Sequence, residues 1–268
     1  MANLDQKALK VFRKEYFPKF LATVDANGVP NVVPVLTLRA ADESTLIFAR
    51  FMVWKTARNL ESTRKAAVAC IGPGLHVWAM KGDFVEFVKQ GPYLEQFNET
   101  ALFRYNAYAG VNEVGVIKVR DVMPPKPVNW LRTLIAQRAV ARAAADAAAR
   151  DGMGPMPLQV VQQFRRKAAL KFIAHVGPDG YPTPRPAMAL FPVTHKRLAF
   201  LDTTGEAMDA GTRVAASVIT KDMIAYQVKG KYAGTGDFGD SGIGSIDVEE
   251  VFTASPPLPG KRIERTGQ

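Results

Sequence analysis

An internal repeat constrains the fold of this chain more than any other feature of its sequence. Residues 20–30 read FLATVDANGVP, and residues 172–182 read FIAHVGPDGYP. The spacing between these segments also holds outside them, where it pairs identical residues: Phe12 with Phe164, Lys19 with Lys171, Pro34 with Pro186, Leu46 with Leu198 and Phe48 with Phe200. A fixed period of this kind indicates that one structural unit occurs twice.

The pattern inside each copy predicts a helix followed by several strands. An amphipathic helix is expected at residues 4–16 and again at 158–169, because apolar residues recur there at helical spacing. A strand and a hairpin turn follow, with Asn27-Gly28 or Asp179-Gly180 at the turn, since both central positions favour positive φ. In copy one we expect further strands at 29–38, 46–49, 66–71, 77–87 and 113–123, and helices at 53–65 and about 92–105.

A segment of different composition separates the copies. Pro124, Pro125 and Pro127 are expected to stop the first unit, because proline has no ladder donor and restricts the residue before it. The Ala-rich stretch 130–150 has high helix propensity. It predicts a connecting helix packed on one unit, with a partner-binding helix as the alternative. The predicted division is 1–123 for copy one, 124–157 for a helical linker and 158–268 for a shortened copy two.

The order of these elements resembles that of a known family. A helix, a strand, an Asn-Gly-x-Pro turn, two strands and a helix with the sequence KTARNL at 55–60 are similar to the first half of a pyridoxamine 5′-phosphate oxidase-like split β-barrel, which binds flavin mononucleotide (FMN). The resemblance covers about residues 12–122 and, in shortened form, 164–262. It implies a mainly β fold of the α+β class: two tandem split β-barrels of about six strands each, joined by a helical linker.

The resemblance also carries expectations about function. In this family FMN lies in the groove between two barrels, so the two units are expected to form an intrachain pseudo-dimer, with a further homodimer as an option. An FMN-dependent oxidoreductase is implied, in which flavin N5 exchanges hydride with an unidentified small molecule and a reduced nicotinamide could be the donor. The alternative is a non-catalytic flavin- or haem-binding protein with a degenerate second site. Haem is the minor cofactor alternative, because a lone histidine can serve as its axial ligand.

The resemblance maps a cofactor site mainly onto copy one. The family's phosphate-binding lysine corresponds to Lys55 at the start of a helix, where backbone amides also favour an anion. Arg58 and Asn59 are on the same helix face. Trp54 could stack on the flavin or simply pack. The strands beside the flavin ring map onto Val33, Pro34, Val35 and Leu36, and onto Phe48 and Ala49.

The two copies keep different basic residues of those that the resemblance assigns to the cofactor site. The family's strand arginine falls on Val33 in copy one but on Arg185 in copy two, whereas copy two has Ala207 in place of Lys55. We therefore expect at most one intact site, on copy one and supported by the other barrel, or loss of flavin binding. The plainer alternatives are that Lys55 and Arg58 are solvated on a helix face and that Arg185 pairs with a carboxylate.

Composition and motifs bound the remaining possibilities. The net charge of +10 comes from lysines and arginines scattered along the chain, which argues against nucleic acid as a partner. The single cysteine, Cys70, excludes an intrachain disulfide and indicates a reducing compartment. With neither a signal-peptide pattern nor an apolar stretch of roughly 20 residues, we expect a cytoplasmic protein without membrane contact. No metal motif and no catalytic constellation stands out, so catalytic residues stay unassigned.

Overall fold

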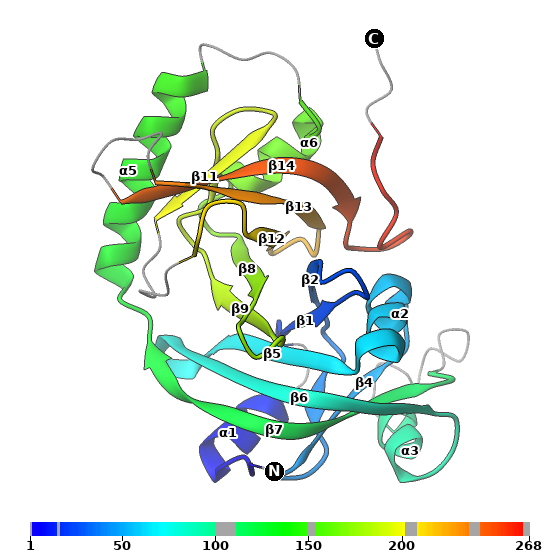
Figure 1. The fold of residues 1–268 in the computed structure, drawn as a ribbon. Helices are drawn as coiled ribbons and strands as arrows, with labels where there is room; N and C mark the ends of the chain where they lie inside the picture. The colour runs from blue at the N-terminus through cyan, green and yellow to red at the C-terminus, as the bar shows by residue number, and fades with distance from the viewer. Residues whose placement is uncertain are drawn as a thin grey trace.

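Two seven-stranded antiparallel sheets, one in each half of the chain, form the framework of the molecule (Figure 1). The computed structural model describes residues 2–14, 17–99, 111–148, 154–201, 208–235 and 242–264. A helix joins the two sheets, so the predicted mainly β, α+β class is confirmed. Whether the two copies arose by duplication stays a prediction.

The first sheet has the strand order β2-β1-β5-β6-β7-β4-β3. The helix α1 (Gln6–Phe12) precedes it, and α2 and α3 interrupt it. The elements are β1 (Phe20–Val24), β2 (Pro30–Pro34), β3 (Arg39–Ala40), β4 (Thr45–Ala49), α2 (Trp54–Thr63), β5 (Lys65–Gly72), β6 (His76–Val88), α3 (Pro92–Asn98) and β7 (Val114–Pro127). The helix predicted at 92–105 ends at Asn98 within the described residues.

The second sheet has the same order when it is read from the equivalent edge: β9-β8-β12-β13-β14-β11-β10. It follows the linker helix α5 (Trp130–Ala148) and the helix α6 (Leu158–Arg165). Its strands are β8 (Leu170–Val176), β9 (Pro182–Pro186), β10 (Phe191–Pro192), β11 (Arg197–Leu201), β12 (Arg213–Ile219), β13 (Ala225–Gly234) and β14 (Ile243–Thr253). Equal strand order is what two copies of one unit would produce.

The returning strand of each hairpin is broken, which gives each sheet seven strands where about six were expected. In the first unit this strand ends at Pro34, and a turn at residues 36–37 precedes β3. In the second unit it ends at Pro186, and a turn at residues 188–189 precedes β10. A proline at each break cannot donate to the sheet ladder. The hairpin turns lie where predicted, with φ of +72° at Gly28 and +74° at Gly180, but Asn27 and Asp179 do not have the positive φ that was expected at both central positions. The backbone N–H of each glycine instead closes a four-residue turn by donating to the backbone oxygen of Asp25 or Gly177.

The prolines after residue 123 do not stop the first unit, contrary to the prediction. β7 continues to Pro127 and still pairs with β6, so that His76 lies opposite Pro127. This end of β7 pairs with β6 alone, because β4 pairs only with residues 114–118. Proline is tolerated on such an edge, where no second strand requires its N–H.

The linker helix α5 packs on the second sheet, at the left of Figure 1. Val140 is buried in one cluster with Phe191 of β10. The side-chain amide of Gln137 donates to the backbone oxygen of Met188 at 3.0 Å. The helix is thus attached to one unit, as expected for a connecting helix.

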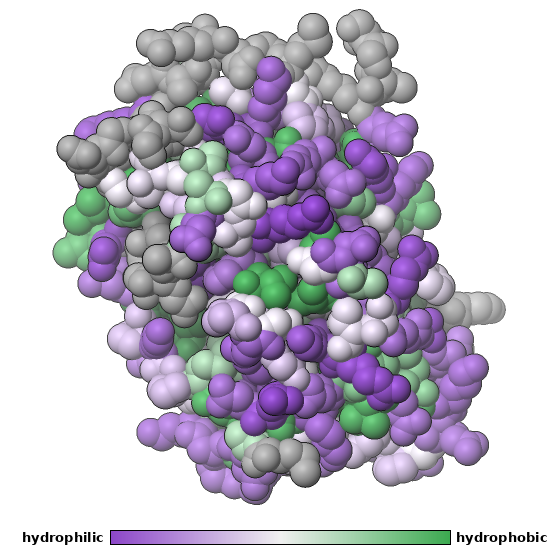
Figure 2. All heavy atoms as spheres, viewed as in Figure 1, coloured by the Kyte–Doolittle hydropathy of each residue, from purple (hydrophilic) through white to green (hydrophobic). Residues whose placement is uncertain are grey.

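The surface is largely hydrophilic on the face shown in Figure 2, with small hydrophobic patches between polar side chains. Exposed apolar side chains include Leu131 and Ile135 on α5. None of the helices that the structure describes is both long enough and apolar enough to cross a membrane.

A shared hydrophobic core joins the two units. The rings of Phe20 and Phe172 stack with their centroids 4.1 Å apart, and both side chains are fully buried. These are the first residues of the repeated segments, so equivalent positions of the two copies meet. Small and branched residues from both sheets surround the pair: Ala22, Val32, Ala69, Ala174, Ala215 and Ile219.

Each unit also covers the edge strand of the other. β2 lies beside β12 and β13, and β9 lies beside β5 and β6. The side-chain amide of Gln227 in β13 donates to the backbone oxygen of Val32 in β2 at 2.6 Å. An uncovered edge would offer unpaired backbone groups to other chains. β2 and β9 therefore run along the junction of the units, where both cavities described below are found.

A glycine in each unit permits two strands to approach closely. Gly82 in β6 and Gly230 in β13 occupy equivalent Lys-Gly pairs, and the strand register shifts at both. A Cβ atom on Gly82 would lie 2.7 Å from the backbone oxygen of Lys118, and one on Gly230 would lie 1.9 Å from that of Asp247. No larger residue fits either position without movement of the backbone.

Candidate functional site

A small cavity lies where β2 and the start of α2 meet the second unit. Its volume is about 40 Å³. The first unit contributes residues of β2 and of the turn into α2, and the second contributes residues of β13, the end of β14 and the segment after it. They are Asn31, Val33, Pro34, Met52, Val53, Trp54, Lys55, Thr56, Gln227, Thr253, Ala254, Pro259 and Gly260. We call this cavity the Lys55 groove.

Lys55 is the cationic centre of the Lys55 groove. Its Nζ is buried without a hydrogen-bond partner among the described residues, and it lies 3.2 Å from the centroid of the Phe252 ring. Burial, followed by the nearby ammonium group of Lys229, lowers the pKa of Lys55 to about 7, while Glu250 and Asp25 oppose this shift. A bound anion would provide the acceptor that this buried amine lacks.

Lys229 supplies a second cation from the other unit. It belongs to β13, and its side chain is buried. Burial lowers the pKa of Lys229, and the carboxylates of Asp25 and Glu250 again act in the opposite direction. Two buried lysines from different units therefore meet beside the groove, an arrangement that neither unit could form alone.

The start of α2 adds backbone amides to the same wall. Its N-cap residue, Val53, makes no side-chain capping hydrogen bond. The first N–H groups of a helix have no intrahelical acceptor and carry partial positive charge. The amides of Trp54, Lys55 and Thr56 therefore favour an anion at this end of the groove.

A buried hydrogen-bond network links β1 and β2 to α2 beside the groove. Nδ2 of Asn31 donates to Oγ1 of Thr56 at 3.2 Å and to Oγ1 of Thr23 at 3.4 Å, and Nδ2 of Asn59 donates to Thr23 at 3.0 Å. Oδ1 of Asn31 has no hydrogen-bond partner in the described part of the chain. The groove thus combines an unsatisfied buried acceptor with the unsatisfied Nζ of Lys55, and such groups call for a polar partner.

Four of the predicted cofactor residues line the Lys55 groove: Val33, Pro34, Trp54 and Lys55. Trp54 is 67% exposed, so it lies at the mouth and is not part of the core. Trp78 is 8% exposed in the core of the first unit and does not line the groove.

The structure does not bring the other predicted residues of copy one into the groove. Arg58 is exposed, whereas Asn59 is on the buried face of α2. Val35 and Phe48 belong to the core of the first unit, and Ala49 belongs to a smaller cluster beside it. Leu36 lies in the turn after β2. Val35 and Leu36 lie beyond the end of β2 at Pro34. Phe48 and Ala49 belong to β4, which is separated from β2 by four strands in the order of the first sheet.

Arg185 lines a different, larger cavity. That cavity has a volume of about 200 Å³ and is formed by β9, the ends of β6 and β7, and the start of α5. Arg185 is 4% exposed on its wall. The arginine does not join Lys55, because β9 lies beside β5 and β6 whereas β2 lies beside β12 and β13. Ala207 lies outside the described residues. We call this second space the Arg185 cavity.

Sequence reasoning missed four residues around the Lys55 groove: Asn31, Gln227, Lys229 and Phe252. The first two line it, and the other two contact Lys55 or shift its pKa. The Lys-Gly pair that β13 shares with β6 does not reveal that Lys229 approaches the other unit, because this depends on how the two sheets pack.

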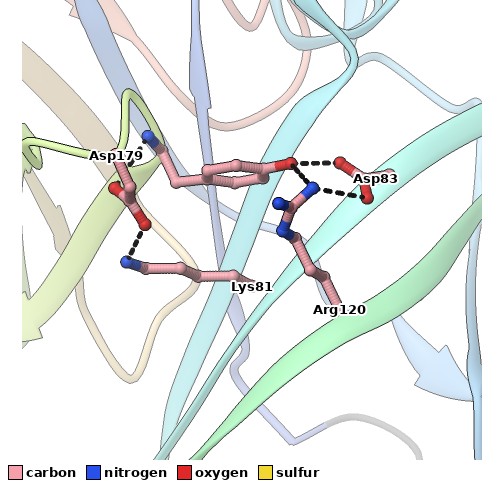
Figure 3. Close-up of polar contacts among 5 residues, drawn as sticks. Lys81, Asp83, Arg120 and Asp179 are labelled. Carbon is pink, nitrogen blue, oxygen red and sulfur yellow. Dashed lines mark hydrogen bonds and ion pairs between the residues drawn. The ribbon is translucent and has the colours of Figure 1, made fainter. Parts of the chain in front are cut away.

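A polar cluster attaches the hairpin of the second unit to the first sheet (Figure 3). Nζ of Lys81 lies 2.6 Å from Oδ2 of Asp179 in the hairpin turn. The hydroxyl of Tyr181 donates to Asp83, and Arg120 donates to the same hydroxyl at 3.0 Å. Burial, then the hydrogen bond to Asp83, raises the pKa of Tyr181, so the phenol stays protonated and remains a donor.

Replacing Tyr181 with phenylalanine should lower the free energy of unfolding by about 1 kcal/mol, because it removes a hydrogen bond to a partly exposed carboxylate. Chemical denaturation measures the change. Tyr226→Phe is the matched control, since the Tyr226 hydroxyl makes no hydrogen bond within the described residues, and its expected effect is close to zero. Equal losses in the two variants would contradict the proposed role of the cluster.

Histidine and metal chemistry receive no support from the described residues. His76, His175 and His195 all lie outside the walls of the Lys55 groove and the Arg185 cavity. The described part of the chain also contains no group of three or more potential metal ligands.

Comparison with known proteins gives distant structural neighbours. No family model matches the sequence, and no curated protein matches it. HupZ from Group A Streptococcus is 24% identical over 44% of this chain and 91% of its own, with a TM-score of 0.37. An FMN-binding protein from Syntrophomonas wolfei is 20% identical over 46% and 89%, with a TM-score of 0.38. HutZ, the haem storage protein from Vibrio cholerae, is 17% identical over 46% and 93%, with a TM-score of 0.35. Similarity this low assigns no function.

Proposed function

We propose that this chain binds FMN at the Lys55 groove and uses flavin N5 for hydride exchange with a small molecule. The observation that carries the proposal is the buried Nζ of Lys55, which lacks a hydrogen-bond partner in the described structure and lies at the uncapped start of α2. A phosphate group would satisfy both the ammonium group and the helix amides.

The groove residues fit the phosphate end of FMN better than its ring. A cavity of about 40 Å³ has room for a phosphate group but not for a tricyclic ring system. Pro259 and Gly260 line the groove on the side of the second unit, and a Cβ atom added at Gly260 would lie 3.8 Å from Cβ of Lys55. The flavin ring of a bound cofactor would therefore extend beyond this cavity.

The roles of the protein groups follow from their positions. Lys55, with Lys229 beside it, would hold the phosphate by charge, and the first amides of α2 would orient it. Val33 and Pro34 would form an apolar wall, and Asn31 would offer its free acceptor to a hydroxyl of the ligand. When bound, the flavin itself supplies the hydride chemistry.

The two units would act as an intrachain pseudo-dimer, because the stacked Phe20 and Phe172 are equivalent positions, as expected near a two-fold axis. A reduced nicotinamide as donor, a further homodimer and a cytoplasmic location stay predictions.

A non-catalytic flavin-binding protein is the second candidate, and the small volume of the groove favours it. Haem ranks below flavin, since none of the three histidines faces the groove.

The test is a titration with FMN and with riboflavin, which lacks the phosphate. Lys55→Ala should weaken FMN binding by about 10- to 100-fold, the effect of losing a charged hydrogen bond, and should leave riboflavin binding unchanged. Arg58→Ala, on the exposed face one turn further along α2, should change neither. Unchanged FMN binding by Lys55→Ala would refute the phosphate assignment, and failure of the unmodified chain to bind either flavin would refute the cofactor.

FMN affinity should also fall as the pH rises above about 7. Lys55 is charged below its pKa of about 7 and neutral above it, so binding at higher pH must first protonate the amine. Because binding takes up one proton at Lys55, this group can lower the affinity for FMN by at most about tenfold per pH unit. Lys55→Arg, with a permanent charge, should make the decline shallower and leave only the part due to Lys229, whose pKa is also lowered. A decline of unchanged steepness in this variant would exclude Lys55 as its source. Bleaching of bound flavin by a reduced nicotinamide would separate an oxidoreductase from a non-catalytic binder.

A further inference from the structure

We propose that the Arg185 cavity binds a small organic anion with an apolar body, such as an aromatic carboxylate. This site is distinct from the Lys55 groove and does not depend on flavin binding there. It lies at the junction of three parts of the chain: the first sheet, the edge strand β9 of the second sheet, and the first turn of α5.

The size of the Arg185 cavity suits a single-ring ligand. Its volume of about 200 Å³ is several times that of the Lys55 groove, at about 40 Å³. Apolar side chains from separate elements line it, including Val77 of β6, Met123 of β7 and Leu201 of β11. Prolines of β7 and β9 complete the wall and limit its freedom to collapse. Concave, mostly apolar surfaces with a few polar groups are typical of small-molecule sites.

The charge of the wall selects an anion. Three lining residues are cationic, namely Lys126, Arg132 and Arg185, and none of the residues that line the cavity is acidic. The side chains of Lys126 and Arg132 make no ion pair or hydrogen bond with the described residues and are exposed to solvent. Both can therefore turn toward a ligand without giving up a partner in the described structure. The planar guanidinium of Arg132 can also bind a carboxylate in bidentate fashion.

The start of α5 positions Arg132. Oδ1 of Asn129 accepts from the backbone N–H of Arg132 at 2.9 Å, and Oγ1 of Thr133 donates to the backbone oxygen of Asn129 at 2.9 Å. The helix is thus capped by its own side chains, so the anion would be held by side-chain cations and not by free helix amides. Thr133, which is buried, and Thr183 add hydroxyl groups to the wall.

The two cavities occupy equivalent places but differ in chemistry. β2 and β9 are equivalent strands, and Val33 of the Lys55 groove corresponds to Arg185. One cavity has the buried Nζ of Lys55 and little space, whereas the other has two solvent-accessible cations beside a larger apolar wall. We infer that each takes its own ligand.

The test uses three probes with the same ring: benzoate, phenyl phosphate and neutral benzamide, titrated into the full chain by calorimetry or NMR. We expect the two anions to bind with a Kd on the order of 1 mM or lower and benzamide to bind at least tenfold more weakly. Whichever anion binds more tightly identifies carboxylate or phosphate as the preferred head group. Equal binding of benzamide and benzoate, or no binding of either anion, would overturn the proposal.

Variants locate the bound probe. The double variant Lys126→Ala with Arg132→Ala should weaken binding of the anions by about tenfold or more, and it should fold normally because both residues are exposed. The matched control is Arg138→Ala with Arg142→Ala, which removes two exposed cations further along α5. Equal weakening in the control would show that only the general charge of the surface matters, which would refute the site.

A competition separates this site from flavin binding. Lys55→Ala should bind benzoate as the unmodified chain does. If FMN displaces benzoate from Lys55→Ala, the Arg185 cavity is a second flavin site and the proposal fails. If the Lys55 groove proves not to bind flavin, benzoate binding at the Arg185 cavity is still expected.

Discussion

Phe172→Ala should lower the free energy of unfolding by about 3–5 kcal/mol, the usual loss when a buried phenylalanine is truncated to alanine. The ring is fully buried and stacked on Phe20, so its removal leaves a cavity in the core that both units share. Denaturant unfolding of the full chain measures the loss. Because the contact joins the units, the variant should also separate the unfolding of the two sheets into distinct transitions.

Two controls make this expectation specific. Phe51→Ala truncates a phenylalanine that is 42% exposed, and its effect should stay within about 0.5 kcal/mol. Phe20→Ala combined with Phe172→Ala should cost less than the sum of the single losses, because both variants remove the same ring contact. Fully additive losses would mean that the two rings stabilise their own sheets independently.

Gly230→Ala should destabilise the chain by about 3 kcal/mol or more, since the added atom meets backbone and not a flexible side chain. Its Cβ atom would lie 1.9 Å from the backbone oxygen of Asp247, so β13 and β14 would have to separate at the bulge. Because Lys229 is the preceding residue, the variant should also weaken FMN binding. Thermal and denaturant unfolding measure the first effect, and a flavin titration measures the second.

Gly28→Ala is the matched control for steric contact. Gly28 has a φ of +72°, and no atom lies within 4 Å of a Cβ added there. Alanine at this position should therefore lower the free energy of unfolding only through its left-handed backbone conformation, by about 1–2 kcal/mol. A loss at Gly230 no larger than the loss at Gly28 would contradict the close approach of the strands.

Local signals in the sequence predicted the elements well. The helix expected at 53–65 is α2, Trp54–Thr63, and the Asn27-Gly28 turn has the positive φ at glycine that its sequence favours. Such features depend on neighbouring residues, which the sequence shows directly. The prediction at Pro124–Pro127 failed for the opposite reason. Proline is excluded only where a strand has partners on both sides. Residues 124–127 pair with β6 alone, and this depends on how the sheet is assembled, which the local sequence does not show.

The site was predicted only in part for the same reason. Lys55 could be found because it begins a helix in a family-like order of elements. Phe252 and Lys229, which determine its environment, lie on the far side of the interface between the units. Arg185 was expected to help Lys55, but strand order alone does not say which edge of one sheet covers which edge of the other.

The covalent connection through α5 has an evolutionary consequence. In a homodimer every substitution appears on both sides of the interface, so its two grooves must change together. Here each residue of the junction occurs once, and the linker keeps the partner unit at a high effective concentration even if one contact weakens. Selection can therefore alter the surroundings of Lys55 without altering those of Arg185, and a single polypeptide can hold two independently evolving pockets.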